Sequence, residues 1–246
     1  MANGYETLSR YYQGIILDDK YNEWTDYLIT LINNHLSPCS TGLDVGCGTG
    51  IFTRKLKSQG YNVKGVDISE YMLNIAKSET LKQRQNIDYL LGDMRSLKSL
   101  EKLDFISSVN DGLNYIPKNG VEKTFKSFNK CLKKCGIVMF DVSTKYKLEK
   151  ILGENMFGDD GEDLSYIWIS EYIKEEEKLN ISVSFFEKDG AVYKRYNEEQ
   201  TEYAHEVEFI IESLKTSGFD IISVTDGFGN EITPTSERAL FLAKKR

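Results

Sequence analysis

Three glycines that alternate with other residues, directly after a short apolar stretch, constrain the fold of this chain more than any other feature. Residues 43–50 read Leu-Asp-Val-Gly-Cys-Gly-Thr-Gly. Glycines at this spacing allow a sharp turn, and they let a ligand approach the backbone closely where a helix begins. The pattern predicts that Gly46, Gly48 and Gly50 form the first strand-to-helix turn of a doubly wound α/β sheet.

The spacing of the glycines separates this loop from two kinds of phosphate-binding loop. A dinucleotide-binding loop has its third glycine at position 51, and a nucleoside triphosphate loop continues with Gly-Lys-Ser/Thr, whereas Gly50 precedes Ile51 and Phe52. Asp44 stands just before the glycines, where a carboxylate repels a pyrophosphate and attracts a cationic amino-acid group or a sulfonium. We therefore expect the ligand to be an adenosine that carries positive charge.

The next three predicted strands also end in carboxylate or amide side chains. Asp67 ends the predicted strand 61–67 and lies 17 residues after Gly50, near the spacing at which a carboxylate accepts hydrogen bonds from ribose hydroxyls. The residues that follow the predicted strands 87–91 and 103–109 are Asp93, Met94, Asn110 and Asp111. Because open α/β sheets bind ligands at the carboxyl ends of their strands, we expect these residues to surround one site.

This ordered set of motifs resembles the class I S-adenosylmethionine-dependent methyltransferases, and among them the small bacterial enzymes with a β insert in the C-terminal half. The matching stretches are 43–50, 65–69, 92–94 and 104–115, and the resemblance covers residues 5–246. It implies a Rossmann-like α/β fold, with a mostly parallel seven-stranded sheet, helices on both faces and an inserted antiparallel β meander. It also implies S-adenosyl-L-methionine as the cofactor.

The resemblance implies a role for each of the strand-end residues. The three glycines would lie against the methionine and ribose, Asp67 at the ribose hydroxyls and Ile68 on the adenine ring. Asp93 and Met94 would lie at the amino edge of the adenine. Asn110 and Asp111 would face the methionine end. The remaining cofactor-binding candidates are Tyr11, Tyr21, Trp24, Asp44 and Cys47, of which Cys47 would pack beneath the ligand.

The aromatic candidates belong to an N-terminal pattern that departs from the family at one position. Tyr11, Tyr21 and Trp24 match it, but Tyr12 stands where the family has an aspartate. Several candidates also have purely structural interpretations. Asp67 would equally cap a helix that begins near Ser69, Asp93 would serve as a turn residue, and the aromatic side chains would pack in the core.

The chain is interpreted as one methyltransferase domain, residues 1–246. Residues 1–40 form a helical cap, residues 41–145 and 205–246 form the cofactor-binding core, and residues 160–204 form the inserted β element. Between residues 164 and 204 apolar residues alternate at period two, which predicts an antiparallel meander of three strands. Because the insert follows the predicted fifth strand, 136–141, it leaves the sheet at the cofactor mouth and would act as a substrate lid or a dimer contact.

Composition limits the partners that this chain can have. No apolar run approaches the roughly 18 residues of a membrane span, and no secretion signal is recognised at the N-terminus. The net charge of −7 argues against nucleic acid as a partner. Four cysteines and two histidines without zinc spacing predict no metal site and reduced thiols in a cytoplasm. The expected assembly is a monomer or a homodimer.

The expected reaction is in-line displacement of a methyl group from a sulfonium to N, O or C of a small-molecule acceptor. A protonated amine must lose a proton before it attacks, whereas a carboxylate or thiolate carries none. The candidate catalytic residues are Tyr115, Tyr193 and His205, with Glu199 as a further candidate, and the sequence singles out none of them. Two alternatives stay open: a non-catalytic S-adenosylmethionine-binding regulatory protein, and a methyltransferase that acts on RNA or protein.

Overall fold

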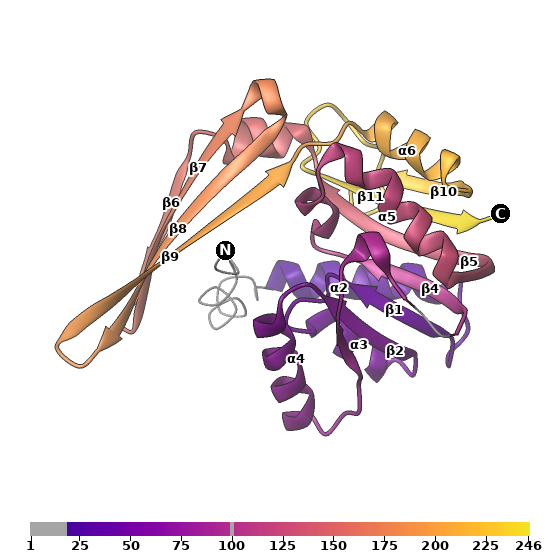
Figure 1. Ribbon diagram of the computed structural model, residues 1–246, viewed down its shortest axis with the longest axis horizontal. Helices are drawn as coiled ribbons and strands as arrows, with labels where there is room; N and C mark the ends of the chain where they lie inside the picture. The colour runs from indigo at the N-terminus through magenta and orange to yellow at the C-terminus, as the bar shows by residue number, and fades with distance from the viewer. Residues whose placement is uncertain (1–18, 99–100) are drawn as a thin grey trace.

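Seven strands form the larger of two sheets in the computed structural model, which describes residues 19–98 and 101–246 (Figure 1). Their order is β10-β11-β5-β4-β1-β2-β3, and every neighbouring pair is parallel except the two pairs that involve β11. The strands are β1 (Thr41–Val45), β2 (Asn62–Asp67), β3 (Tyr89–Leu91), β4 (Leu103–Ser108), β5 (Leu132–Ser143), β10 (Phe219–Thr225) and β11 (Arg238–Lys245). The predicted mostly parallel seven-stranded sheet is confirmed.

The strand order places a ligand site at the middle of the sheet. Strand β1 lies between β2 and β4, so the chain progresses outward in one direction from β1 to β3 and in the other from β4 to β5. At such a switch point the loops after neighbouring strands separate and leave a crevice at the carboxyl ends. The glycine loop follows β1 directly and therefore opens into this crevice.

Helices cover both faces of the large sheet, as predicted. On one face α2 (Asp19–Asn33) and α3 (Ile51–Ser58) supply Leu28, Ile32 and Leu56 to the core, and on the other α5 (Lys118–Cys131) and α6 (Val207–Thr216) supply Phe125 and Leu214. Helix α4 (Glu70–Lys82) begins at Ser69, whose hydroxyl accepts a hydrogen bond from the backbone N–H of Met72. No helix of residues 19–98 and 101–246 is long and apolar enough to cross a membrane.

The insert is a separate antiparallel sheet of four strands, one more than predicted. Its order is β6 (Met156–Asp160), β7 (Leu164–Ile173), β8 (Lys178–Asp189) and β9 (Val192–Tyr203). Strand β6 escaped prediction because all five of its residues are exposed, so its sequence lacks the alternation that burial of one face imposes. Its backbone pairing with β7 holds it in place, and the sheet begins at Met156 rather than at residue 160.

The small sheet extends from the large one as an arm with two different faces (Figure 1). One face buries Leu179, Ile181 and Val183 of β8. The opposite face exposes Met156 and Ile169, which lie opposite each other on β6 and β7. The short elements at the base of the arm and around the crevice are η1 (Met94–Ser96), η2 (Gly112–Tyr115), η3 (Lys147–Leu152) and η4 (Lys174–Glu176).

Candidate functional site

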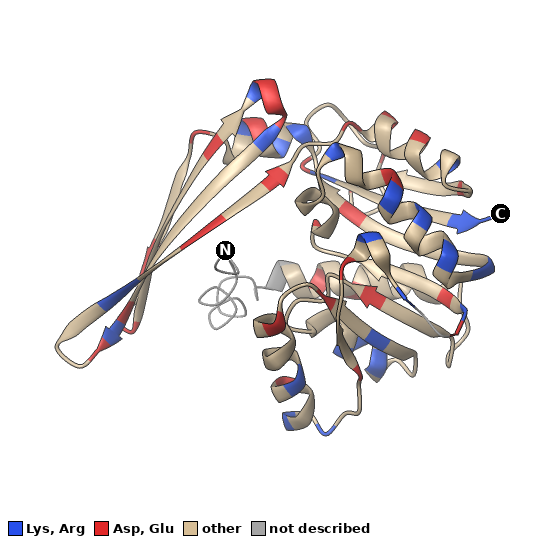
Figure 2. Ribbon diagram, in the orientation of Figure 1, with Lys and Arg blue, Asp and Glu red and all other residues tan. Residues whose placement is uncertain are grey.

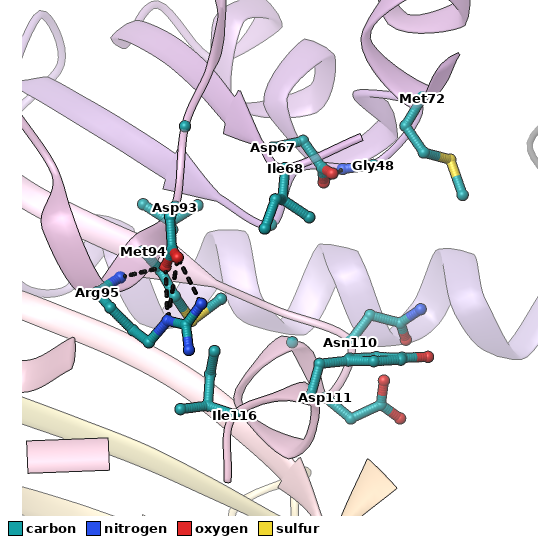
Figure 3. Close-up of a pocket in the computed structure, with 15 residues that line it drawn as sticks. Gly48, Asp67, Ile68, Met72, Asp93, Met94, Arg95, Asn110, Asp111 and Ile116 are labelled. Carbon is teal, nitrogen blue, oxygen red and sulfur yellow. Dashed lines mark hydrogen bonds and ion pairs between the residues drawn. The ribbon is translucent and has the colours of Figure 1, made fainter. Parts of the chain in front are cut away.

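A cavity of about 250 Å³ opens at the carboxyl ends of β1, β2 and β4. Figure 3 shows Gly48, Asp67 and Ile68 on one side of it and Asn110 and Asp111 on another. The sequence-predicted residues that line it are Gly46, Gly48, Asp67, Ile68, Asp93, Met94, Asn110, Asp111 and Tyr115. The fold thus brings together side chains from four separate loops around one space.

Asp67 organises the glycine loop as well as lining the cavity. Its Oδ2 accepts a hydrogen bond from the backbone N–H of Gly48 at 2.7 Å, and its Oδ1 accepts one from the N–H of Ser69 at 2.8 Å. Burial raises the pKa of this carboxyl, and the backbone hydrogen bonds oppose the shift. Asp67 therefore stabilises the glycine loop and the start of α4, and it also lines the cavity, while its role at the ribose hydroxyls stays a prediction.

Two glycines of the loop are needed for different reasons. Gly50 has φ of +75°, and a Cβ built there would lie 2.5 Å from the hydroxyl of Tyr89. Gly48 has φ of +52°, but no atom lies within 4 Å of the position its Cβ would take. A side chain at Gly48 would therefore project into open space at the cavity, where a ligand can approach the backbone.

An apolar wall and an ion pair form the side of the cavity that faces β3. Ile68 is 62% exposed although it is a large apolar residue, and Met94 lies across from it. Asp93 accepts hydrogen bonds from the Arg95 guanidinium, the shortest at 2.6 Å, and these bonds lower the pKa of Asp93. Arg95 also lines the cavity. Arg95 was not predicted, because it lies one residue beyond the motif Gly92-Asp93-Met94 that follows the strand.

The turn after β4 is strained and is held by a buried carboxylate. Asn110 and Asp111 have φ of +67° and +55°, a conformation that is uncommon for residues other than glycine. Their backbone N–H groups donate to the two oxygens of Asp141, at 2.6 and 3.2 Å. Asp141 is fully buried and forms an ion pair with Arg238. Neither Asp141 nor Arg238 was among the predicted site residues.

Trp24 supports this network instead of lining the large cavity. The Arg238 guanidinium lies over its ring, 4.9 Å from the centroid, and the ring packs edge-on against Phe228 at 5.6 Å. Tyr21, from the same helix, lines a smaller hollow of about 40 Å³ behind the glycine loop, with Asp44 and Cys47. Tyr11 lies outside the described residues, and so does Tyr12.

Asp44 and Cys47 have buried surroundings. Asp44 accepts hydrogen bonds from the hydroxyls of Thr53 at 2.6 Å and Ser107 at 2.8 Å. Burial raises the pKa of Asp44 to about 6 against these bonds. Cys47 packs on the cluster of Leu73, Ala76 and Tyr89, and burial raises the pKa of its thiol well above the usual range. The thiol is therefore protonated near neutral pH and suited to packing beneath a ligand.

The structure separates the predicted catalytic residues widely. Tyr115 lines the cavity, and its hydroxyl donates to Gln200 Oε1 at 3.1 Å. Tyr193 is 54% exposed beside the turn that joins β8 and β9, at the far end of the arm in Figure 1. His205 is buried, its Nε2 is 3.0 Å from the carbonyl oxygen of Ile116, and burial lowers its pKa. Glu199 lies exposed on β9.

Sequence reasoning missed two buried glutamates on β9. Glu198 and Glu202 are 5% and 6% exposed, and their partners across the sheet are Val183 and Leu179 of the apolar face. Glu202 Oε1 lies 3.4 Å from the hydroxyl of Tyr115, which connects β9 to the cavity. A carboxylate at such a position costs free energy unless something compensates it. The sequence alone could not reveal these two residues. Their burial follows from the residues they pair with on β8, and that pairing register is known only from the structure.

Comparisons with known proteins agree with this geometry. A family model described as a methyltransferase domain matches residues 43–136. A Bacillus subtilis (strain 168) protein named "Putative methyltransferase YqeM" is 34% identical over 244 residues, which cover 98% of this chain and 97% of that protein. A Geobacillus sp. (strain WCH70) protein with the same description is 30% identical and covers 98% of this chain and 99% of its own length.

Two solved structures extend these comparisons. The crystal structure of an S-adenosylmethionine-dependent methyltransferase from Clostridium acetobutylicum ATCC 824 has a TM-score of 0.86 and 30% identity, with 99% of each chain covered. An amino pentose methyltransferase from Micromonospora echinaspora, solved with S-adenosylmethionine bound, has a TM-score of 0.74 and 16% identity, with 100% of this chain and 99% of that chain covered. The second comparison concerns the fold alone.

Proposed function

Because this chain belongs to the S-adenosylmethionine-dependent methyltransferases, we propose that it transfers the methyl group to a small-molecule acceptor bound under the four-stranded sheet. The observation that carries the proposal is the continuity of the cavity with β9. Tyr115 lines the cavity and at the same time donates a hydrogen bond to Gln200 of β9. The arm would therefore border the place where an acceptor meets the cofactor, and residues of the insert would select it.

The residues around the cavity fit the cofactor that the family uses. The open position at Gly48 gives the methionine and ribose access to the backbone, and Asp67 offers carboxylate oxygens to ribose hydroxyls. Ile68 and Met94 would hold the adenine between apolar surfaces, with Asp93 at its edge. The cofactor supplies a methyl group on a positively charged sulfur. The strained turn at Asn110 and Asp111 would hold the methionine end.

The chain's own contribution to the reaction would be alignment and exclusion of water. A methyl transfer needs the attacking atom, the methyl carbon and the sulfur in line, and holding them so accounts for much of an enzyme's acceleration. The backbone N–H groups of Asn110 and Asp111 donate to Asp141, and these hydrogen bonds would keep the turn beside the sulfur rigid. Tyr115, and Gln200 to which it donates, would border the acceptor on the other side.

The distribution of charge supports a small acceptor over nucleic acid. Figure 2 shows acidic residues on β9, whereas basic residues are spread over α5, the end of β11 and both ends of the arm. Phosphate backbones bind where lysine and arginine gather at the site itself. We also propose a cytoplasmic location, because Cys39, Cys47, Cys131 and Cys135 are free thiols, as is usual in a reducing compartment.

Calorimetric titration with S-adenosylhomocysteine tests the cofactor site. We expect tight binding to the wild-type protein and a loss of about tenfold or more in Asp67→Ala, since hydrogen bonds to a charged acceptor are among the strong ones. Glu70→Gln is the matched control, because it removes an exposed carboxylate only three residues away. Unchanged affinity in Asp67→Ala would remove Asp67 from the ribose role.

Label transfer tests the acceptor class. The protein would be incubated with methyl-labelled S-adenosylmethionine and, separately, with the small-molecule, RNA and protein fractions of a bacterial extract. We expect label in the small-molecule fraction only. Label in RNA or protein would replace the proposed acceptor class, and cofactor binding without label in any fraction would favour the regulatory alternative.

A further inference from the structure

We infer that the methyl acceptor is an amine, bound as its ammonium ion between Asp111 and Glu202, and that Glu202 accepts the proton that the amine loses. This inference rests on the proposed function and goes beyond it, because it names the chemical class of the acceptor and a catalytic residue. It begins from the position of Glu202 in the four-stranded sheet.

The register of β9 places a row of polar side chains on the apolar face of the arm. Glu198, Gln200 and Glu202 are separated by two residues each, so they share one face of the strand. Their cross-strand partners on β8 are Val183, Ile181 and Leu179, all of which are buried. The opposite face carries Glu199 and Thr201. Glu198 and Glu202 are therefore carboxylates set beside buried apolar side chains.

Glu202 has hydrogen-bonding capacity that the described part of the chain does not use. Its side chain is almost fully buried, and its Oε1 receives one long hydrogen bond, from Tyr115 at 3.4 Å. Its Oε2 is buried without a hydrogen-bond partner among residues 19–98 and 101–246. A buried carboxylate oxygen without a donor costs free energy, which a ligand that brings N–H donors would recover.

The surroundings of Glu202 join it to the cofactor cavity. Asp111, which precedes η2, and Tyr115 of η2 both line the cavity and both act on Glu202 electrostatically. Two cations also act on this site. Lys147 of η3 donates to the Ser143 hydroxyl at 3.2 Å and its charge acts on Glu202, whereas Arg238 of β11 is paired with Asp141. The oxygen of Glu202 that lacks a donor and the carboxylate of Asp111 thus form an acidic site beside Lys147.

The charges distinguish an amine from other acceptors. A carboxylate acceptor, or the phenolate that a phenol becomes, would add negative charge beside Asp111 and Glu202 and would be disfavoured. An amine is attracted as an ammonium and becomes neutral when it loses its proton. Burial raises the pKa of Glu202 to about 8, with Asp111 adding to the shift and Lys147, Tyr115 and Arg238 opposing it. A base with a pKa near the working pH is suited to remove that proton.

The proposed reaction balances in atoms and charge. Glu202 takes one proton from the ammonium nitrogen, and the freed lone pair forms the new nitrogen–carbon bond to the methyl group. The carbon–sulfur bond breaks with its electron pair on sulfur, which becomes a neutral thioether. The methylated nitrogen carries the positive charge that the sulfonium lost, and the proton on Glu202 is released to solvent after the product leaves.

Sinefungin provides a test that needs no knowledge of the acceptor. It is an adenosine analogue with a primary ammonium where S-adenosylmethionine has its methyl sulfonium, so it places a positive nitrogen at the acceptor side of the site. The ratio of the dissociation constants of S-adenosylhomocysteine and sinefungin would be measured by calorimetry in wild type, Glu202→Gln and Glu171→Gln. Glu171 is the matched control, because it is an exposed carboxylate on the same sheet.

Above about pH 8, where the Glu202 carboxyl is ionised, we expect the preference for sinefungin to fall by about tenfold or more in Glu202→Gln, because a buried ammonium then loses one of its two charged partners. S-adenosylhomocysteine should bind equally to all three proteins. An unchanged preference in Glu202→Gln would overturn the inference and leave the proposed function intact. Failure of S-adenosylhomocysteine to bind the wild-type protein would instead overturn the proposed function.

The wild-type protein offers a second readout that does not depend on how a variant folds. Ionisation of Glu202 should strengthen sinefungin binding as the pH rises through about 8, the pKa of this carboxyl. The binding of S-adenosylhomocysteine, which has no ammonium at that position, should not show the same rise. Parallel pH profiles for the two ligands would contradict the assignment of Glu202 as the proton acceptor.

Discussion

Buried carboxylates occur both on the seven-stranded sheet and on strand β9, and they are compensated differently. Asp44 accepts two hydroxyl hydrogen bonds, and Asp141 accepts two backbone N–H groups and pairs with Arg238. Within residues 19–98 and 101–246, Glu202 receives a single long bond, from Tyr115, on one oxygen. The donors of the large sheet hold the turn beside the cavity, whereas we assign the uncompensated oxygen on β9 to the ligand.

The largest effect should come from removing a compensated carboxylate of the large sheet. Asp141→Ala leaves the backbone N–H groups of Asn110 and Asp111 and the Arg238 guanidinium without their acceptor. We expect the free energy of unfolding to fall by about 3 kcal/mol, as when one partner of a buried ion pair is removed. Urea unfolding followed by circular dichroism measures this change.

Asp104→Ala is the matched control for Asp141→Ala. Asp104 also accepts a backbone N–H, from Thr41 at 2.9 Å, and pairs with Lys133 at 2.7 Å, but it is 27% exposed. Solvent screens such a pair, so its loss should cost less than about 1 kcal/mol. Equal losses in the two variants would mean that burial of Asp141 does not set the strength of its network.

Removing the uncompensated carboxylate of β9 should have the opposite sign. The pKa of Glu202 is raised from 4.5 to about 8 in the folded protein, so its contribution to stability is complete below pH 4.5 and is lost as the pH rises through 8. Glu202→Gln avoids this loss. We expect it to exceed the wild type in stability by on the order of 5 kcal/mol at pH 9 and to differ little near pH 4.5.

Urea unfolding at a series of pH values would establish this difference. The pKa of Asp44 is raised from 3.8 to about 6, so this residue also lowers the free energy of unfolding as the pH rises from about 4 to 6. Because Asp44 is present in both proteins, its effect cancels when the two are compared. Glu171→Gln again serves as the control and should follow the wild-type curve. A Glu202→Gln protein that loses stability as steeply as wild type between pH 6 and 9 would show that Glu202 is already compensated in the folded state.

The same contrast explains what the sequence could reveal. Gly48, Asp67 and Asp111 were predictable because each lies within a loop that directly follows an apolar strand, so local spacing alone fixes its place at the sheet edge. Asp141 obeys the same rule at the end of the predicted fifth strand and could have been included. Its partner Arg238 is 97 residues away, and only the pairing of β11 with β5 brings the two together.

The residues of the arm were beyond the sequence for a physical reason. Residues 196–203 read Tyr-Asn-Glu-Glu-Gln-Thr-Glu-Tyr, and polar residues on both faces hide which face is buried. Only the register against β8 shows that Glu202 lies on the apolar side and Glu199 on the other. His205 was a candidate base because of its residue type alone. In the structure its ring is buried and forms a hydrogen bond with a backbone carbonyl, which the sequence could not show.

A smaller effect should separate backbone strain from ligand access at the glycine loop. Gly48 and Gly60 have φ of +52° and +92°, and neither has an atom within 4 Å of a built Cβ. Gly48→Ala and Gly60→Ala should therefore each cost about 1 to 2 kcal/mol of stability. Only Gly48→Ala should also weaken S-adenosylhomocysteine, because only Gly48 lines the cavity. Equal binding by both variants would show that the ligand does not approach the loop backbone.

The smallest predicted effect concerns the hydroxyl that connects the two regions. Tyr115 donates toward Glu202 Oε1 at 3.4 Å, and this hydrogen bond lowers the pKa of the carboxyl against the effect of burial. Tyr115→Phe should therefore raise the pKa of Glu202 slightly, visible as a shift of the sinefungin pH profile to higher pH. Tyr193→Phe removes a hydroxyl at the exposed far end of β9, where it lies 3.4 Å from the Glu162 carbonyl oxygen, and should leave the profile in place. The hydroxyl of Tyr193 is too far from Glu202 to change its pKa directly. An equal shift of the profile in both variants would therefore show that the pH dependence does not arise at the contact between η2 and β9.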